Sequence, residues 1–203
     1  MHISEGILSA PVLLSGAALS AAGTAIGLKK MDYDHLPRVA VLSAGFFVAT
    51  LVHIPVGPAS AHLILNGLMG VFLGWVAFPA ILIGLMLQAL LFQYGGLTTL
   101  GVNCLNMAIP ALICFYIFGS FIRAKKIFYS MTASFLCGFG AVFLGSLMLA
   151  LNLVFTGEYF SAVAKLIVFA HFPVMVLEGF ITALCVKFFK RVKPELLEVI
   201  YAR

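Results

Sequence analysis

A histidine at the second position gives this chain the spacing of a terminal metal chelate. The chain opens with MHISEG, so a free amine at Met1, the backbone nitrogen of His2 and the His2 imidazole can all reach one metal ion. Amine and amide nitrogen close a five-membered chelate ring, and amide nitrogen and Nδ1 close a six-membered ring. One further nitrogen completes a square plane, the geometry typical of Ni(II) and Cu(II). We expect Met1 to be retained, because initiator methionine is removed only before a small residue. We expect no cleaved leader, since no charged n-region or cleavage site precedes the apolar run.

Two more histidines flank the segment HIPVGPASAH, and His62 is our candidate for the fourth nitrogen. His53 is the next candidate, although an interhelical hydrogen bond is the commoner role of a membrane histidine. Pro55, Gly57 and Pro58 prevent a regular helix between the two. Irregular backbone at membrane depth is tolerated only where it is buried in protein or lines a wet cavity. The segment therefore suits a binding site.

Other polar side chains in apolar stretches are expected to surround the site or couple it to transport rather than bind the ion. They are Asn66, Thr98, Thr99, Asn103, Asn106, His171 and Glu178. For the asparagines and His171, interhelical hydrogen bonding is the alternative. A charged Glu178 at mid-membrane costs ~2.5–3.5 kcal/mol, so we expect it to be protonated, paired with His171 or displaced toward an interface. We place it in the cytoplasmic half of the last helix, away from the outer site.

Composition indicates an all-α integral membrane protein made of a single membrane domain, residues 1–203. Of the 203 residues, 63% are hydrophobic and 9% are charged, and the mean hydropathy is +1.16. Soluble domains carry about 25% charged residues. The net charge of +5 is therefore interpreted through its placement, and no nucleic-acid partner is expected. The four cysteines lie in apolar stretches without a C-x-x-C pair and are expected to be small buried hydrophobes.

The apolar runs predict a seven-helix bundle. The predicted helices cover about 7–28, 39–54, 60–75, 77–93, 103–122, 127–155 and 160–189. Basic residues cluster at 29–38, 123–126 and 187–203. With seven spans, all three clusters lie on one side, which is cytoplasmic by the positive-inside rule. This places the amino terminus outside and the carboxyl terminus in the cytoplasm.

Four segments together resemble the CbiM/NikM family, the substrate-binding (S) components of energy-coupling-factor (ECF) transporters for cobalt and nickel. They are MHISEG, HIPVGPASAH, LLFQYGGLTTLGVN and HFPVMVLEGFIT, and the resemblance runs from residue 1 to about 189. It implies a seven-helix bundle with the amino-terminal segment tucked in from outside, and a metal site of Met1, His2 and His62. It also implies a transmembrane coupling (T) subunit, two ATPase subunits and a small membrane accessory subunit as partners.

Two departures from the family pattern bear on the metal. Some cobalt-type members have TGSCSH where this chain has GPASAH, and a cleaved leader before MHI. The chain differs on both points, which leaves nickel at least equal to cobalt. The imported metal would serve cobalamin biosynthesis or a nickel enzyme.

The predicted function is substrate capture by an ATP-driven importer of Ni(II) or Co(II), multi-pass in the cytoplasmic (inner) membrane of a prokaryote. The chain has no Walker A sequence, so ATP hydrolysis must come from partners; we expect neither an enzyme nor an organic cofactor. One alternative is a secondary transporter or channel for divalent metal, whose inverted repeats are not found. Another is an intramembrane metal-dependent hydrolase, but no H-E-x-x-H occurs. A vitamin-binding component of the same transporter class would not need His2 and His62.

Overall fold

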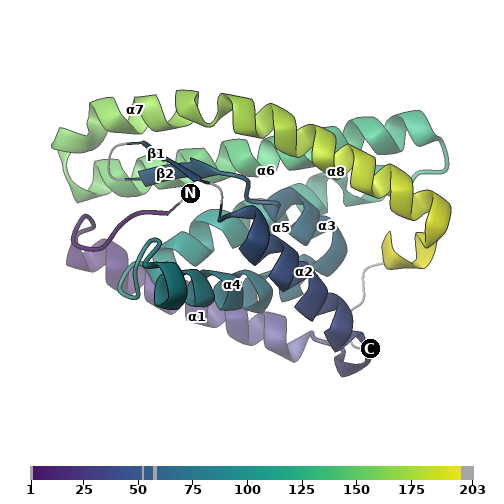
Figure 1. Cartoon of the computed structure of the whole chain (residues 1–203), viewed down its shortest axis with the longest axis horizontal. Coiled ribbons are helices and arrows are strands. Elements are labelled where there is room, and N and C mark those ends of the chain that lie inside the picture. Colours follow the sequence, from purple (N-terminus) through teal and green to yellow (C-terminus); the bar gives the residue numbers. More distant parts are fainter. Residues whose placement is uncertain (1, 52, 57–58, 198–203) are drawn as a thin grey trace.

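The computed structural model describes residues 2–51, 53–56 and 59–197, which form a helical bundle with one β-hairpin (Figure 1). The α-helices are α1 Ala10–Lys29, α2 Leu36–Ala49, α3 Asn66–Leu73, α4 Ala77–Phe92, α5 Leu100–Ile122, α6 Ile127–Thr156, α7 Ser161–Ala170 and α8 Phe172–Val192. The strands are β1 His53–Val56 and β2 Ala59–His62. Short 3-10 turns cover η1 Tyr33–His35, η2 Gly74–Val76, η3 Glu158–Phe160 and η4 Pro194–Leu197.

A hairpin occupies the segment where proline and glycine exclude a helix. β1 and β2 pair antiparallel, with His53 opposite His62 and Val56 opposite Ala59. The predicted helix 60–75 is therefore wrong at its start, because α3 begins only at Asn66. Leu65, just before it, has φ +54°, a left-handed conformation that a continuous helix cannot contain.

The predicted last helix, 160–189, is two helices that meet at His171. Pro173 lies in the first turn of α8 and has no N–H to donate to the preceding turn. The ladder nevertheless continues on both sides of the junction. The His171 N–H donates to Ile167 O at 3.1 Å, and the Met175 N–H donates to His171 O at 2.8 Å. α7 and α8 thus form one kinked apolar segment.

Five segments among the described residues are long and apolar enough to cross a membrane. They are Ala10–Lys29, Asn66–Phe92, Leu100–Ile122, Ile127–Thr156 and Ser161–Val192. The helix predicted at 39–54 ends at Ala49 as α2 and has 14 residues, shorter than the about 17–25 that a span needs. The count of seven spans and the sides of the termini stay predictions.

Short helix α3 lies at the centre of the bundle, with all of its residues buried. Its backbone contacts its neighbours directly through glycine. A Cβ added to Gly67 would lie 2.7 Å from Gly138 Cα in α6, and one added to Gly70 would overlap Ala111 O in α5. These close approaches fix the path of the chain that follows the hairpin.

Gly70→Ala should lower the free energy of unfolding by about 1–3 kcal/mol, because the new methyl group must displace the α5 backbone. Gly45→Ala in α2 is the control, since a Cβ there meets nothing within 4 Å. Thermal unfolding in detergent compares the two. A Gly70→Ala protein that is as stable as the Gly45→Ala protein would contradict the packing of α3.

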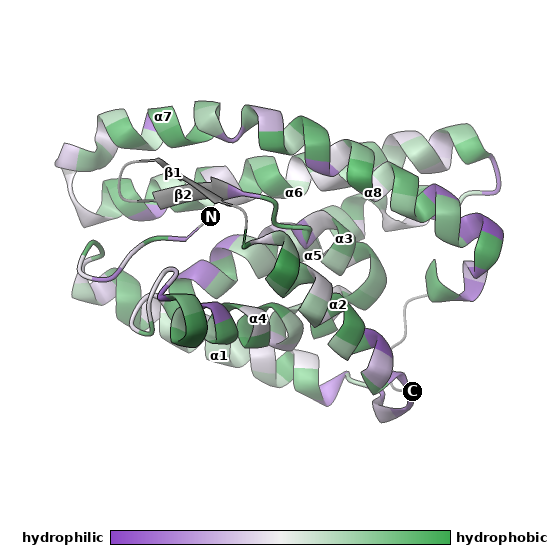
Figure 2. Ribbon diagram, viewed as in Figure 1, coloured by the Kyte–Doolittle hydropathy of each residue, from purple (hydrophilic) through white to green (hydrophobic). Residues whose placement is uncertain are grey.

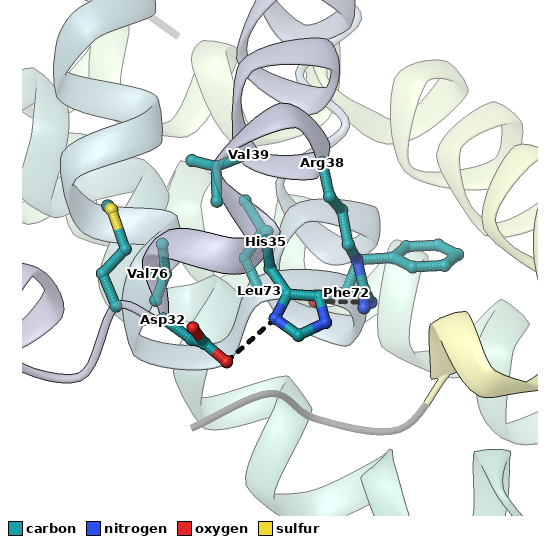
Figure 3. Close-up of a pocket in the computed structure, with 8 residues that line it drawn as sticks. Asp32, His35, Arg38, Val39, Phe72, Leu73 and Val76 are labelled. Carbon is teal, nitrogen blue, oxygen red and sulfur yellow. Dashed lines mark hydrogen bonds and ion pairs between the residues drawn. The ribbon is translucent and has the colours of Figure 1, made fainter. Parts of the chain in front are cut away.

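Basic residues lie in the last turns of α1 and α8. Figure 2 colours these two helix ends purple, as hydrophilic. Lys190 donates a hydrogen bond to Ala124 O in the loop between α5 and α6. Arg38 Nη2 donates to Phe72 O at 2.8 Å (Figure 3). It also donates to Leu196 O, so it joins α2, the end of α3 and η4. α3 therefore runs from the hairpin at its start to this basic end.

Candidate metal site

The amino-terminal segment is held in the bundle by the first turn of α5. The Ile3 N–H donates to Asn103 Oδ1 at 2.9 Å, and Asn103 Nδ2 donates back to Ile3 O at 3.2 Å. Thr99 Oγ1 also donates to Ile3 O, at 2.9 Å. Ile3 is 0% exposed, so these bonds satisfy a main chain that water does not reach. The predicted supporting residues Thr99 and Asn103 thus fix the chain one residue from His2.

A glycine pair lets the loop before α5 approach this segment. Gly95 and Gly96 have φ +75° and +149°, where L side chains are strained. A Cβ on Gly95 would lie 3.5 Å from His2 Cβ, and one on Gly96 would overlap the Glu5 side chain. The Thr98 N–H donates to Glu5 Oε1 at 3.1 Å. Glu5 was not predicted as a site residue, although its place in MHISEG was the available signal.

The structure brings His2 and His62 together. Their rings stack, with centroids 4.6 Å apart and planes 24° apart. His2 is 5% exposed and His62 is 3% exposed. His62 Nδ1 lies 2.7 Å from Leu63 O. Since a carbonyl only accepts, Nδ1 carries the proton and the Nε2 of His62 carries the lone pair that a metal would use.

Two predicted residues fall wholly or partly outside the described part of the chain. The prediction for Met1 lies outside the described residues. For His53 the structure gives only the backbone, which pairs with His62 in the hairpin.

A third histidine is close enough to act electrostatically on His62. His171, at the junction of α7 and α8, is buried, and its Nδ1 donates to Ile167 O at 2.8 Å. Burial lowers the pKa of His62 well below its ordinary value, and any positive charge on the terminal amine, His2 or His171 lowers it further. His62 is therefore neutral at neutral pH, the form in which imidazole binds metal.

Glu178 does not lie where the sequence placed it. Its Oε1 accepts hydrogen bonds from the Ile64 N–H at 2.5 Å and the Leu65 N–H at 2.7 Å. The placement away from the site is wrong, because this carboxylate holds the chain directly after His62. Two backbone N–H groups, rather than His171, are the hydrogen-bond partners that compensate its burial.

The other asparagines pack helices. Asn66 Nδ2 donates to Ala141 O at 3.2 Å and to Met107 O at 3.4 Å, so it joins α3 to α5 and α6. Asn106 Oδ1 accepts from Asn152 Nδ2 at 2.8 Å. Both residues therefore form interhelical hydrogen bonds, the alternative role considered for them from the sequence.

Side chains alone do not make a metal site in the described ranges. No three His, Cys, Asp or Glu side chains among them converge as metal ligands. Further ligands of a site built on His2 and His62 would come from main-chain nitrogens, the terminal amine or side chains outside the described ones.

Comparisons with known proteins give consistent similarities. Residues 2–196 match the family model CbiM, described as a cobalt uptake substrate-specific transmembrane region. A protein of Haemophilus influenzae whose name assigns it to metal transport is 40% identical over 202 residues, 97% of each chain. The fused nickel transport protein NikMN of Rhodobacter capsulatus is 39% identical over 115 residues, covering 54% of this chain and 33% of that protein. A crystal structure of a truncated transition metal transporter has a TM-score of 0.77 at 26% identity, covering 95% of this chain and 99% of the other.

Proposed function

Because the chain belongs to the CbiM family of cobalt uptake substrate-specific transmembrane proteins, we propose that it captures Ni(II) or Co(II) as the S component of an ECF-type importer. As a member of this family it is a multi-pass metal transport protein and not an enzyme. The observation that carries the proposal is the buried, stacked pair of His2 and His62, whose centroids lie 4.6 Å apart.

In this proposal the ion is bound by four nitrogens: the Met1 amine, the His2 amide nitrogen and Nδ1, and His62 Nε2. The hydrogen bonds of Asn103 and Thr99 to Ile3 support it, because they hold the terminal chelate against α5. The Nδ1 bond of His62 to Leu63 O supports the choice of Nε2. A planar four-nitrogen set suits Ni(II), so nickel is at least as good a substrate as cobalt. Binding releases protons from the amine and the amide.

The proposed partners are a T subunit, two ATPase subunits and a small membrane accessory subunit. The relative named as a fused nickel transport protein, NikMN, supports assembly with partners. The proposed location is the cytoplasmic membrane of a prokaryote, with the basic end of the bundle inside. The contacts of Lys190 with Ala124 and of Arg38 with Leu196, which bring the three basic clusters together at one end, support that orientation.

Isothermal titration of the purified protein with Ni(II), Co(II) and Mg(II) tests the proposal. We expect one equivalent of Ni(II) or Co(II) to bind and Mg(II), which prefers oxygen ligands, not to compete. A protein that binds neither transition metal would overturn the proposed function.

Asn103→Leu should weaken Ni(II) binding by about 10–100-fold while the protein stays folded, because the variant keeps the branched shape of the side chain but releases the Ile3 backbone. Asn152→Leu is the matched control: it breaks an amide pair between α5 and α6 that does not touch Ile3. Titration and thermal unfolding are measured for both variants. Equal Ni(II) affinity in the two would show that the Asn103 bonds do not hold the chelate.

A further inference from the structure

The carboxylate of Glu178 continues a chain of hydrogen bonds that begins at His62. His62 Nδ1 donates to Leu63 O, and the next two N–H groups, of Ile64 and Leu65, donate to Glu178 Oε1. Leu65 has φ +54°, a conformation that costs a non-glycine residue about 1–2 kcal/mol. Such strain persists only where surrounding contacts fix it. Two bonds to one carboxylate oxygen supply that constraint three residues from His62.

Helix α8 packs in close backbone contact with α6 beside this turn. A Cβ on Gly138 would lie 2.5 Å from Glu178 O, and one on Gly179 would lie 2.8 Å from the Phe135 ring. Gly138 in turn contacts Gly67 of α3 backbone to backbone. Three helices therefore set the position of the carboxylate relative to the start of α3.

Glu178 can also supply a negative charge to offset the positive charge of a metal-loaded site. A divalent ion bound to one deprotonated amide and three neutral nitrogens keeps one positive charge, and a buried charge is costly unless it is paired. Among the acidic side chains that the structure describes, only Glu178 is buried, at 0% exposed. Its second oxygen, Oε2, is buried and has no hydrogen-bond partner among the described residues.

We propose that Glu178 is the positioning residue of the metal site: it orients His62 through residues 63–65, and its negative charge offsets that of the bound ion. The first part concerns the fold of the metal-free protein. The second part rests on the proposed function.

Two variants separate the hydrogen bonds that Glu178 accepts from its negative charge. Glu178→Gln keeps an oxygen that accepts both N–H bonds but removes the charge, whereas Glu178→Ala removes both. Thr182→Val is the control, because Thr182 is a buried polar residue one turn later on α8 whose Oγ1 has no hydrogen-bond partner among the described residues. Each protein is measured by hydrogen exchange of the peptide that contains the Ile64 and Leu65 amides, without metal, and by Ni(II) titration.

We expect Glu178→Gln to keep slow exchange but to bind Ni(II) about 10–100-fold more weakly. Glu178→Ala should exchange faster at these two amides and bind more weakly still, and Thr182→Val should match wild type in both measurements. Wild-type exchange in Glu178→Ala would overturn the positioning role, and wild-type affinity in Glu178→Gln would overturn the charge role.

If Glu178→Ala does not fold, Glu178→Asp replaces it, since the shorter side chain keeps the charge but cannot reach both amides equally. Faster exchange at Ile64 and Leu65 supports positioning, and unchanged exchange overturns it. If wild type binds neither Ni(II) nor Co(II), the proposed function fails, while the metal-free exchange measurement still decides the positioning role.

Discussion

Replacing His62 with alanine should lower Ni(II) affinity by more than about 100-fold without unfolding the protein. Removal of a direct ligand costs more than the 10–100-fold typical of residues that only orient ligands. His62 lies at the end of β2 and stacks on His2, outside the apolar segments that stabilise the bundle. Titration calorimetry on protein shown to be monodisperse measures the loss.

His35→Ala is the control for this variant. His35 lies at the basic end of the molecule, where its Nδ1 pairs with Asp32 Oδ2 at 3.0 Å (Figure 3). The His35→Ala protein should bind Ni(II) as wild type does. If His62→Ala binds as tightly as His35→Ala, His62 is not a ligand, and His53 becomes the residue to replace next.

Adding a single residue before Met1 should abolish Ni(II) and Co(II) binding. The His2 amide then no longer shares a five-membered ring with the terminal amine. The new amine could use the Met1 amide, but the imidazole would lie one residue further along, with another amide to deprotonate. An amino-terminal tag, a retained formyl group or acetylation should do equal damage, because each removes the free amine.

The same tag placed after Arg203 is the control, and intact mass confirms that Met1 is the first residue of the control protein. Both proteins should unfold at the same temperature, since the five long apolar segments are unchanged. A front-tagged protein that binds as tightly as the back-tagged one would rule out the terminal chelate.

Chelate geometry and the composition of two loop segments pointed to residues that the structure places close together. Ring sizes pointed to His2, and a proline- and glycine-rich segment between apolar runs pointed to His62; the two rings stack at 4.6 Å. The hydroxyls and amide of GGLTTLGVN were predicted to serve the site, and Thr99 and Asn103 hold Ile3. Local chemistry guides such predictions because it limits which residues can bind metal or satisfy a buried backbone.

Glu178 could not be placed by the same reasoning. Spacing along a helix gives the face on which a residue lies but not the segment packed against that face. The Ile64 and Leu65 amides lie against Glu178 because α3 begins after a hairpin and a left-handed Leu65. Hydropathy does not distinguish a short apolar strand from the start of a helix, so residues 60–62 were predicted to be helical. The kink at His171 likewise depends on Pro173 within an otherwise continuous apolar run.

X-ray absorption at the nickel edge most directly tests the central claim, that the ion is held by a terminal nitrogen chelate and His62. The sample is Ni(II)-loaded protein with a free Met1 amine and a tag after Arg203. The account predicts a square-planar site of four nitrogen donors with scattering from two imidazoles, falling to one imidazole in any metal retained by His62→Ala. A six-coordinate site dominated by oxygen, or two imidazoles persisting in His62→Ala, would contradict it.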